Sequence, residues 1–439
     1  MKMNTTNLLR NAATAAAAAW LYIGTGTAAG SGQVFDAVVA ADGTGQYATV
    51  QQAIDAAPAG RTSPWLIFVK AGSYEGSVVI PADKPFIHLI GQDSKLTSIH
   101  RSLNVGGKPE PGKAAADTAY WAHSVHNPAS DVYGAPGSVV TVEASDFYTT
   151  GISYVNDYGV NAQNGPQALA MKSRGDRAAF FDCAFRSFQD TWMTTQNDTY
   201  RQYVSHCYIE GAVDYFYGGG NVLLENCTLF NVRRGSIIVA PSHDKAPWGY
   251  VFRNCTIDGN AEARRDAKTK LGRPWHNSPR AVYIHTTMNI PIAPEGWTDM
   301  GAIPALFAEY DSRDAEGRPI DLSRRKSSYK GRGDNPPTGT CPTTVTKAEA
   351  DSMDYDHMMP GTDGWNPRAM MERLPAPAGV KADGEAVSWQ PVAGARGYVV
   401  TAGDKVVGIT AEPRLAAPPT TDLEQLRVRA VNSHGTLGL

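Results

Sequence analysis

The stretch FFDCAF at residues 180–185 decides the fold, because its pattern recurs along the chain. Each copy places a cysteine three residues after one apolar residue and two before another, and the further copies read VSHCYI at 204–209, LENCTL at 224–229 and FRNCTI at 252–257. The cysteines are 24, 20 and 28 residues apart, and self-similarity at such a period is typical of a solenoid. The segments are β-rich and alternate in polarity, so they favour a parallel β-helix over helical repeats. A β-sandwich with coincidental cysteines is the alternative.

Two aspartates keep the register of this repeat. Asp190 lies seven residues after Cys183, and Asp214 lies seven residues after Cys207. If each coil takes about two dozen residues, the two carboxyl groups lie on neighbouring rungs, whose strands are about 4.8 Å apart. Two carboxyl groups that close cannot easily both ionise, so their pKa values should separate into an acid and a base. The pair therefore predicts a hydrolase.

Around these aspartates the chain resembles the pectin methylesterases, over roughly residues 34 to 370. LGRPW at 271–275 is the most specific single match. The other matching motifs come in the family's order: ADGTGQYATVQQAI at 41–54, GSYE at 72–75, LIG at 89–91, QALAM at 167–171, QDT at 189–191, GAVDYFYG at 211–218, PEGW at 294–297 and DGWNP at 363–367. The resemblance implies a right-handed parallel β-helix and hydrolysis of the C6 methyl esters of polygalacturonate. Because no cluster of metal ligands is visible in the sequence, we expect no cofactor and no metal.

The resemblance also assigns roles to residues. Asp214 would attack the ester carbonyl as the nucleophile, and Asp190 would donate a proton to methanol and then act as general base. Gln167 and Gln189 match the oxyanion-hole glutamines, and Arg273 would hold Asp214 ionised. The structural alternative for the two glutamines is a hydrogen-bonded ladder along the solenoid. The structural alternative for Arg273 is an ordinary ion pair.

Aromatic residues near the aspartates are the predicted sugar-binding surface. Trp275 would offer a flat apolar face to a sugar ring, with plain packing as the alternative. Two further candidates are Tyr217 and Trp192, which stand where this chain departs from the family pattern: YFYG at 215–218 replaces Phe-Ile-Phe-Gly, and Trp192 begins a pair that is commonly Leu-Tyr. These departures bear on fine substrate preference and not on the reaction.

Other enzyme classes fit the motifs less well. A polysaccharide lyase would need acidic Ca²⁺ ligands, and an inverting glycosidase needs carboxyl groups about 6.5–9.5 Å apart. The sequence contains neither the Gly-x-Ser-x-Gly elbow of serine hydrolases nor the His-Glu-x-x-His pattern of zinc enzymes. A non-catalytic glycan-binding β-helix remains the main rival, followed by the lyase.

Composition is consistent with a large globular chain. It has 439 residues, of which 42% are hydrophobic, enough for a large core, and 43 glycines for the bends of a solenoid. A formal net charge of −3 argues against binding nucleic acid through bulk electrostatics. No stretch approaches the length of a membrane span. We expect a monomer that acts on methyl-esterified polygalacturonate.

The N-terminus predicts export. Residues 1–29 combine Lys2 and Arg10, an apolar run at 12–23 and a small-residue cleavage site at 27–29. A secreted or periplasmic location follows, with an untargeted Ala-rich tail as the alternative. We expect the repeat cysteines to stack as small buried hydrophobes and not as disulfides.

The remaining segments suggest the domain limits. The β-helix domain is expected over 34–370, with a long insertion at 100–137 whose Tyr120 and Trp121 could stack on sugar or pack on the surface, and with a short helix at 346–351. Residues 376–439 resemble a fibronectin type III module, a small β-sandwich. Because the boundary at Pro375–Pro377 looks like a linker, few contacts are expected to cross it.

Overall fold

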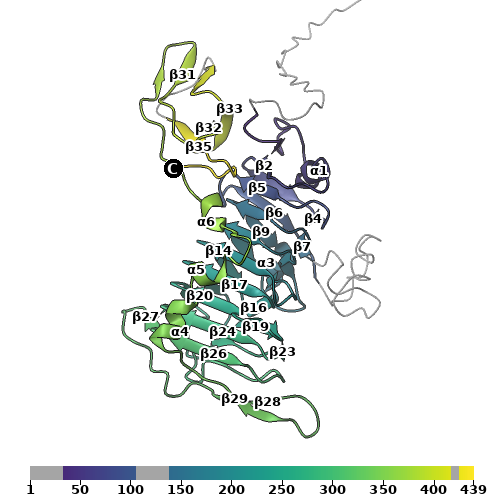
Figure 1. The fold of residues 1–439 in the computed structure, drawn as a ribbon, viewed down its shortest axis with the longest axis vertical. Helices are drawn as coiled ribbons and strands as arrows, with labels where there is room; N and C mark the ends of the chain where they lie inside the picture. Colours follow the sequence, from purple (N-terminus) through teal and green to yellow (C-terminus); the bar gives the residue numbers. More distant parts are fainter. Residues whose placement is uncertain (1–32, 105–137, 417–424) are drawn as a thin grey trace, which may run out of the picture. The chain divides into compact units, whose positions relative to one another are not determined.

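The computed structural model describes residues 33–104, 138–416 and 425–439. The predicted signal peptide at 1–29 and the pair Tyr120 and Trp121 lie outside these residues. Three long sheets of parallel strands follow one another around a coil (Figure 1). The chain runs from sheet 1 to sheet 2, then to sheet 3, and returns to sheet 1 one rung further on.

Sheet 1 has ten strands: β1 (Ala37–Val39), β2 (Trp65–Val69), β5 (Ile87–Gly91), β8 (Tyr148–Thr150), β11 (Ala178–Phe181), β14 (Arg201–Ser205), β17 (Asn221–Glu225), β20 (Tyr250–Arg253), β24 (Arg280–Ile284) and β26 (Leu306–Tyr310). Sheet 2 has nine: β3 (Gly72–Glu75), β6 (Thr97–Arg101), β9 (Ser153–Asn156), β12 (Ala184–Arg186), β15 (Tyr208–Gly211), β18 (Thr228–Asn231), β21 (Thr256–Gly259), β25 (Thr287–Met288) and β27 (Arg313–Asp314). Sheet 3 has eight: β4 (Val78–Ile80), β7 (Ser138–Val142), β10 (Leu169–Ser173), β13 (Trp192–Met193), β16 (Val213–Gly218), β19 (Ile237–His243), β22 (Lys270–Gly272) and, paired with β19, β23 (His276–Asn277). This arrangement confirms the predicted parallel β-helix.

The predicted repeat is the inner wall of the coil. Phe180 pairs in register with Val204, Val204 with Leu224, and Leu224 with Phe252, and all four are fully buried in one core cluster. The four repeat cysteines join the same cluster as free thiols, which confirms that they pack as buried hydrophobes. Apolar burial on the inner face of every rung therefore drives the coiling.

A left-handed residue turns the chain at the first corner, between sheets 1 and 2. The residue before each repeat cysteine has a positive φ: Asp182 (51°), His206 (55°), Asn226 (56°) and Asn254 (51°). Asp, Asn and His are the non-glycine residues that occur most readily in this conformation. The composition of the repeat thus follows from the backbone geometry of its corner.

Within the described ranges, five short helices lie outside the coil. α1 (Val50–Asp55) begins with a capping box, as does α4 (Lys347–Ser352), which confirms the helix predicted at 346–351. The others are α3 (Asp157–Ala162), α5 (Tyr355–Met358) and α6 (Pro367–Met370). Residues of the segment from α4 to α6 bury apolar side chains against the outer face of sheet 1, where Tyr203 and Leu223 belong to the same cluster. A hairpin, β28 (Ser328–Lys330) with β29 (Thr338–Thr340), precedes this segment.

The described residues of the C-terminal segment, 376–416 and 425–439, form two antiparallel three-stranded sheets. One contains β30 (Lys381–Ala382), β31 (Ala386–Ser388) and β34 (Arg414–Ala416), and the other contains β32 (Gly397–Ala402), β33 (Lys405–Thr410) and β35 (Leu426–Val431). Trp389 and Tyr398 are buried in the module's own core cluster. The two sheets agree with the predicted small C-terminal β-sandwich.

The expectation that few contacts join this module to the β-helix is wrong. Val399, Val431 and Leu437 of the module share a buried cluster with strand residues of the first rungs, namely Leu66, Phe68, Ile90 and Tyr148. The Tyr148 hydroxyl lies 2.7 Å from Thr436 Oγ1, and Arg429 donates to the carbonyl of Gln92 at 3.0 Å. The physical reason is that sheet 1 is apolar on both faces in these rungs, so its outer face has to be covered.

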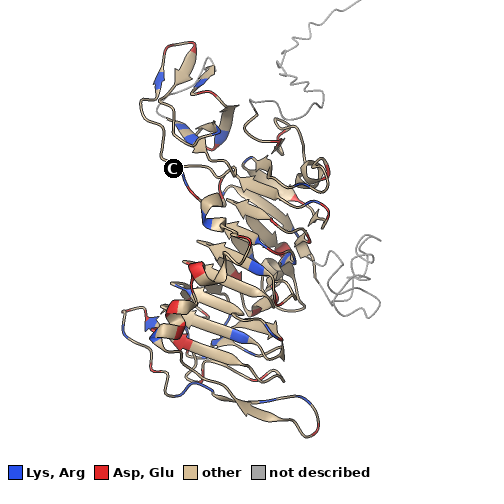
Figure 2. Cartoon of the chain, viewed as in Figure 1, with Lys and Arg blue, Asp and Glu red and all other residues tan. Residues whose placement is uncertain are grey.

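Charged residues of both signs are interspersed along the strands and loops (Figure 2). Among the residues that the structure describes, no helix is long and apolar enough to cross a membrane.

Candidate active site

Asp190 and Asp214 occupy equivalent places on adjacent rungs, at the second corner, between sheets 2 and 3. Asp190 comes two residues before β13, and Asp214 is the second residue of β16. The two strands pair with Trp192 opposite Phe216, so the offset of 24 residues predicted from the repeat is the register of the structure. Both aspartates have a positive φ, 59° and 48°. The amide of Asp190 donates to the carbonyl of Val213 at 2.9 Å, which links the two corners directly.

Arg273 holds Asp214 in a two-pronged hydrogen bond. It follows the last residue of β22, and its Nε and Nη2 atoms lie 2.8 and 2.5 Å from the two carboxylate oxygens of Asp214. The side chain of Asp214 is only 8% exposed. Burial raises the pKa of Asp214, while the hydrogen bonds and charge of Arg273 and the charge of Arg233 act against that rise. The predicted pairing of Arg273 with Asp214 is therefore present.

Asp190 has the more strongly perturbed carboxyl group. Burial is the largest cause that raises the pKa of Asp190 well above its usual range, and the negative charge of Asp214 adds to it. The charge of Arg273 and hydrogen bonds from the side chains of Gln189 and Tyr217 oppose the rise. Because Arg273 binds Asp214 directly, it favours the ionised form of Asp214, whereas burial and the charge of Asp214 favour the protonated form of Asp190.

The two predicted glutamines lie on neighbouring rungs beside the pair. Gln189 precedes Asp190 and hydrogen-bonds to it, and a methyl group on Gly165 would come within 3.0 Å of Gln189 Oε1. Gln167 lies two residues before β10, and the amide of Ala168 donates to the carbonyl of Gln189 at 3.0 Å. Backbone pairing thus brings both glutamine-bearing segments to the corner where Asp190 stands.

An apolar patch covers the outer face of sheet 3 next to the aspartates. Leu169, Met193, Tyr217 and Ala240 form one cluster, against which the partly exposed Trp275 packs. The rings of Tyr217 and Trp275 meet edge to face, with centroids 5.5 Å apart. The structure therefore brings two of the three predicted aromatic residues to the site.

The prediction that Trp192 contacts substrate is wrong. Trp192 is fully buried inside the coil, where its ring packs against Phe180, Phe185 and Phe216, and its Nε1 atom donates to Ser173 Oγ at 2.9 Å. Side chains alternate along β13, so Trp192 points inward and its neighbour Met193 points outward.

Arg233 is a site residue that the sequence pattern missed. It lies in the loop between β18 and β19, which is the second corner one rung beyond Asp214. Its positive charge acts on both Asp214 and Arg273, and burial lowers the pKa of its own guanidinium. The residue seven positions after Cys227 is Arg234, which we did not assign to the site, and its guanidinium pairs with Asp266 at 2.9 Å on the exposed side. The position of Arg233 in the corner loop was the available signal.

Among the described residues, no group of three or more His, Cys, Asp and Glu side chains is placed to hold a metal ion. The site thus consists of two carboxyl groups, two arginines, two amides and an apolar platform. Such a set can supply a nucleophile, a proton donor and donors for a developing oxyanion.

Comparison with known proteins gives the chain its relatives. The family model described as "Pectinesterase" matches residues 36–331. "Pectinesterase 31" of Arabidopsis thaliana is 33% identical over 281 residues, which cover 62% of this chain and 80% of that protein.

Solved structures agree on the fold. "Pectin methylesterase from Carrot" matches with a TM-score of 0.59 at 23% identity, over 77% of this chain and 96% of that chain. A pectin methylesterase crystallised in complex with hexasaccharide VII matches with a TM-score of 0.57 at 24% identity, over 76% of this chain and 99% of that chain. The matched residues make up more than half of the sequence and include the corner with Asp190 and Asp214. This chain therefore belongs to the pectinesterase family.

Proposed function

We propose that this pectinesterase hydrolyses the C6 methyl esters of polygalacturonate through a covalent intermediate on Asp214, releasing methanol and pectate. The observation that carries the proposal is the Asp214 carboxylate held by Arg273 one rung from Asp190, whose pKa is raised well above its usual range. A nucleophile and a proton donor side by side are what the cleavage of an ester requires.

In the first step, an oxygen of Asp214 attacks the ester carbonyl carbon. The C–O bond to the methoxy group breaks, and Asp190 gives its proton to the departing oxygen, so that methanol leaves and an acyl-enzyme anhydride remains. The amide groups of Gln167 and Gln189 donate hydrogen bonds to the oxyanion that forms at the carbonyl oxygen. The hydrogen bond from Gln189 to Asp190 supports this placement at the reacting centre.

In the second step, Asp190 is ionised and takes a proton from water. The resulting hydroxide attacks the carbonyl carbon of the former ester, the bond to Asp214 breaks, and both carboxyl groups return to their starting states. Arg273 keeps Asp214 oriented throughout, because its rigid fork matches both carboxylate oxygens.

Substrate recognition is proposed to use the outer face of sheet 3. Trp275 and Tyr217 present apolar ring surface next to the aspartates, which suits the face of a sugar ring. Arg233 adds a positive charge that favours a polymer carrying free carboxylates. The hexasaccharide bound by the related pectin methylesterase is in keeping with an oligosaccharide ligand.

The deciding experiment follows the products formed from methyl-esterified polygalacturonate. We expect methanol release without any unsaturated uronate, and with full activity after exhaustive chelation of metals. Loss of activity with a chelator and recovery with Ca²⁺, together with an unsaturated product, would favour a lyase. Binding without methanol release would identify a glycan-binding protein.

The remaining expectations concern the whole chain. We propose that residues 1–29 direct export to the periplasm or the medium, that the protein is a monomer, and that residues 376–439 are a fibronectin type III-like module. The two antiparallel sheets around Trp389 support the last point. Fractionation of expressing cells, light scattering and a solved structure of the module would test the three in turn.

A further inference from the structure

A serine, a histidine and an aspartate stand in line on the first rungs of sheet 2, away from the aspartate pair. Ser73 is in β3, His100 is in β6 and Asp157 is the first residue of α3. Ser73 Oγ lies 2.8 Å from Nε2 of His100, and Nδ1 of the same ring lies 2.6 Å from Oδ2 of Asp157. None of the three takes part in the proposed demethylation.

The hydrogen bonds of this group fix its protons. A carboxylate can only accept, so the ring nitrogen facing Asp157 carries the hydrogen. In the neutral ring the other nitrogen, facing Ser73, is then a base with a free lone pair, and the serine hydroxyl must donate to it. This is the arrangement by which a histidine activates a serine, and it is recognised by geometry and not by sequence position.

No other histidine that the structure describes has a carboxylate on one ring nitrogen and a hydroxyl on the second. His285 pairs with Asp311, and His357 with Asp354, each through one nitrogen. The side chains of His100 and Asp157 are 24% and 33% exposed, and Ser73 is exposed. The group is therefore open to reagents, unlike a buried network that only stabilises the fold.

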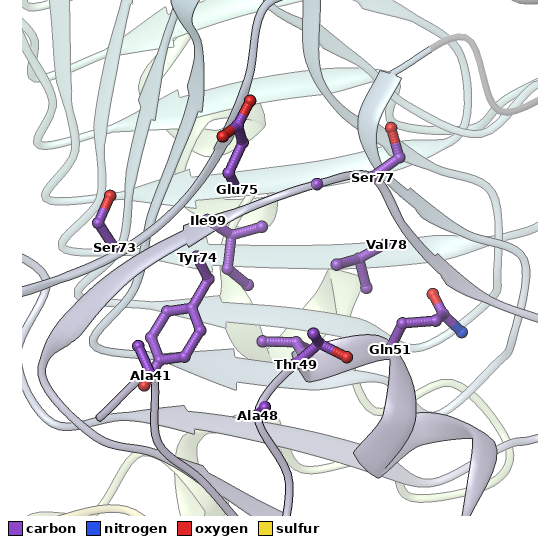
Figure 3. Close-up of a pocket in the computed structure, with 12 residues that line it drawn as sticks. Ala41, Ala48, Thr49, Gln51, Ser73, Tyr74, Glu75, Ser77, Val78 and Ile99 are labelled. Carbon is purple, nitrogen blue, oxygen red and sulfur yellow. The ribbon is translucent and has the colours of Figure 1, made fainter. Parts of the chain in front are cut away.

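Ser73 lies at the open edge of sheet 2. β3 is the last strand of that sheet, and the amides of Gly72 and Gly76 donate towards β6. By the alternation of a strand, the amides of Ser73 and Glu75 face the open edge. Figure 3 shows Ser73 and Glu75 on one side of β3 and Tyr74 on the other.

We propose that Ser73, His100 and Asp157 form a second esterase centre, which cleaves neutral acyl esters at the exposed face of sheet 2. The carboxylate of Glu75 lies on the same side of β3 as Ser73 (Figure 3) and disfavours anionic acyl groups. The amide of Ser73 is the donor for the oxyanion, and Asp157 acts by holding the ring of His100.

The reaction balances without any further reactant. The Ser73 oxygen attacks the ester carbonyl carbon while His100 takes the hydroxyl proton. The C–O bond to the alcohol breaks, and His100 passes that proton to the alcohol. Water then attacks the acyl group on Ser73, His100 takes and returns a proton, and a carboxylic acid leaves.

The test uses the full chain with Asp214→Asn, so that the aspartate site is silent. The probes are p-nitrophenyl acetate, followed by release of the phenolate, and a fluorophosphonate, followed by peptide mapping. We expect one phosphonylated residue, Ser73, and loss of acetate hydrolysis in Ser73→Ala. His100→Gln should slow both reactions roughly 100-fold or more, since a positioned general base contributes that much.

Ser98→Ala is the matched control, because Ser98 is the register partner of Ser73 on the neighbouring strand. This control should hydrolyse and label as the parent does. Asp157→Asn should lower the rate of labelling without moving the labelled position. Labelling of Ser73 no faster than of Ser98, or equal labelling after His100→Gln, would overturn the proposal. In the chain with an intact Asp214, Ser73→Ala should leave methanol release from pectin unchanged, so the two sites fail independently.

Discussion

The two corners of the coil share one backbone conformation, but their side chains have different environments and different proposed roles. At the first corner, Asp182 has φ of 51°, and at the second corner Asp190 and Asp214 have φ of 59° and 48°. The side chain of Asp182 is 43% exposed and pairs with Arg373, whereas that of Asp214 is 8% exposed and pairs with Arg273. The left-handed turn selects the residue type, but burial and neighbours select the chemistry.

The neighbours along each stack sharpen this difference. At the first corner, Asp182 is followed one rung on by His206 and then by Asn226, so like charges are not stacked. At the second corner a carboxyl group follows a carboxyl group, which is costly unless one of them stays protonated. The stacked carboxyl groups therefore lower the stability of the fold at the corner where the reaction is proposed to take place.

Asp214→Asn is expected to have the largest effect. An amide is a far weaker nucleophile than a carboxylate, so methanol release should fall by at least ~1,000-fold. Asp182→Asn, the same change at the first corner, should leave the rate unchanged. Circular dichroism and melting curves would establish that both variants fold. Wild-type turnover by folded Asp214→Asn would remove the distinction between the corners.

Gln189→Ala should come next. The loss of one oxyanion donor lowers kcat by about 100- to 1,000-fold, with little change in KM, because the hydrogen bond strengthens in the transition state. Steady-state kinetics on methylated oligogalacturonate measures both constants. A rise in KM at constant kcat would instead assign Gln189 to ground-state binding.

Arg273→Lys should lower kcat/KM by about 10- to 100-fold, since it breaks a two-pronged hydrogen bond to a charged partner. The pH profile gives a sharper readout. Arg273 lowers the pKa of Asp214, and Asp214 must be ionised to attack. Weaker pairing therefore raises that pKa, and the acid limb of the profile moves to higher pH. Arg234→Lys, which alters the exposed pair with Asp266, should move neither limb.

The two faces of sheet 3 should separate in a pair of tryptophan variants. Trp275→Ala on the outer face should raise KM about tenfold through lost ring contact, with an unchanged melting temperature. Trp192→Phe in the core should lower the melting temperature by a few degrees and leave KM as it was. The reverse pattern would put Trp192 back among the substrate contacts.

Deletion of residues 376–439 should have the smallest effect on turnover, because the residues proposed for catalysis lie between Gln167 and Arg273. It should nevertheless lower the melting temperature by several degrees, since Leu66, Phe68 and Ile90 lose their cover. Scanning calorimetry tests the expected loss of thermal stability, and kcat measured at low temperature tests the expected retention of turnover. An unchanged melting temperature would mean that the contacts between the module and sheet 1 add little to stability.

The sequence by itself determined the coil, its register and the aspartate pair. A cysteine at a fixed place in each rung, followed by an aspartate at a fixed spacing, is a local and repeated pattern, and such patterns carry over directly to stacked rungs. The pairing of Arg273 with Asp214 could be expected because LGRPW is the most specific single match to the family, and the family resemblance assigns that role to its arginine. The helix expected at 346–351 begins with a capping box in the structure, which is a local feature as well.

Only the tertiary structure decided which way side chains point after a corner and which distant segments meet. The left-handed residue at each corner resets the alternation of the next strand, so Trp192 turned inward although it lies two residues from Asp190. Arg233 reaches the site because its rung differs in length from the one before. Ser73, His100 and Asp157 come from three rungs with no shared motif, and the module covers sheet 1 across more than 300 residues of chain. Contacts of this kind depend on how whole elements stack in space, which no local spacing records.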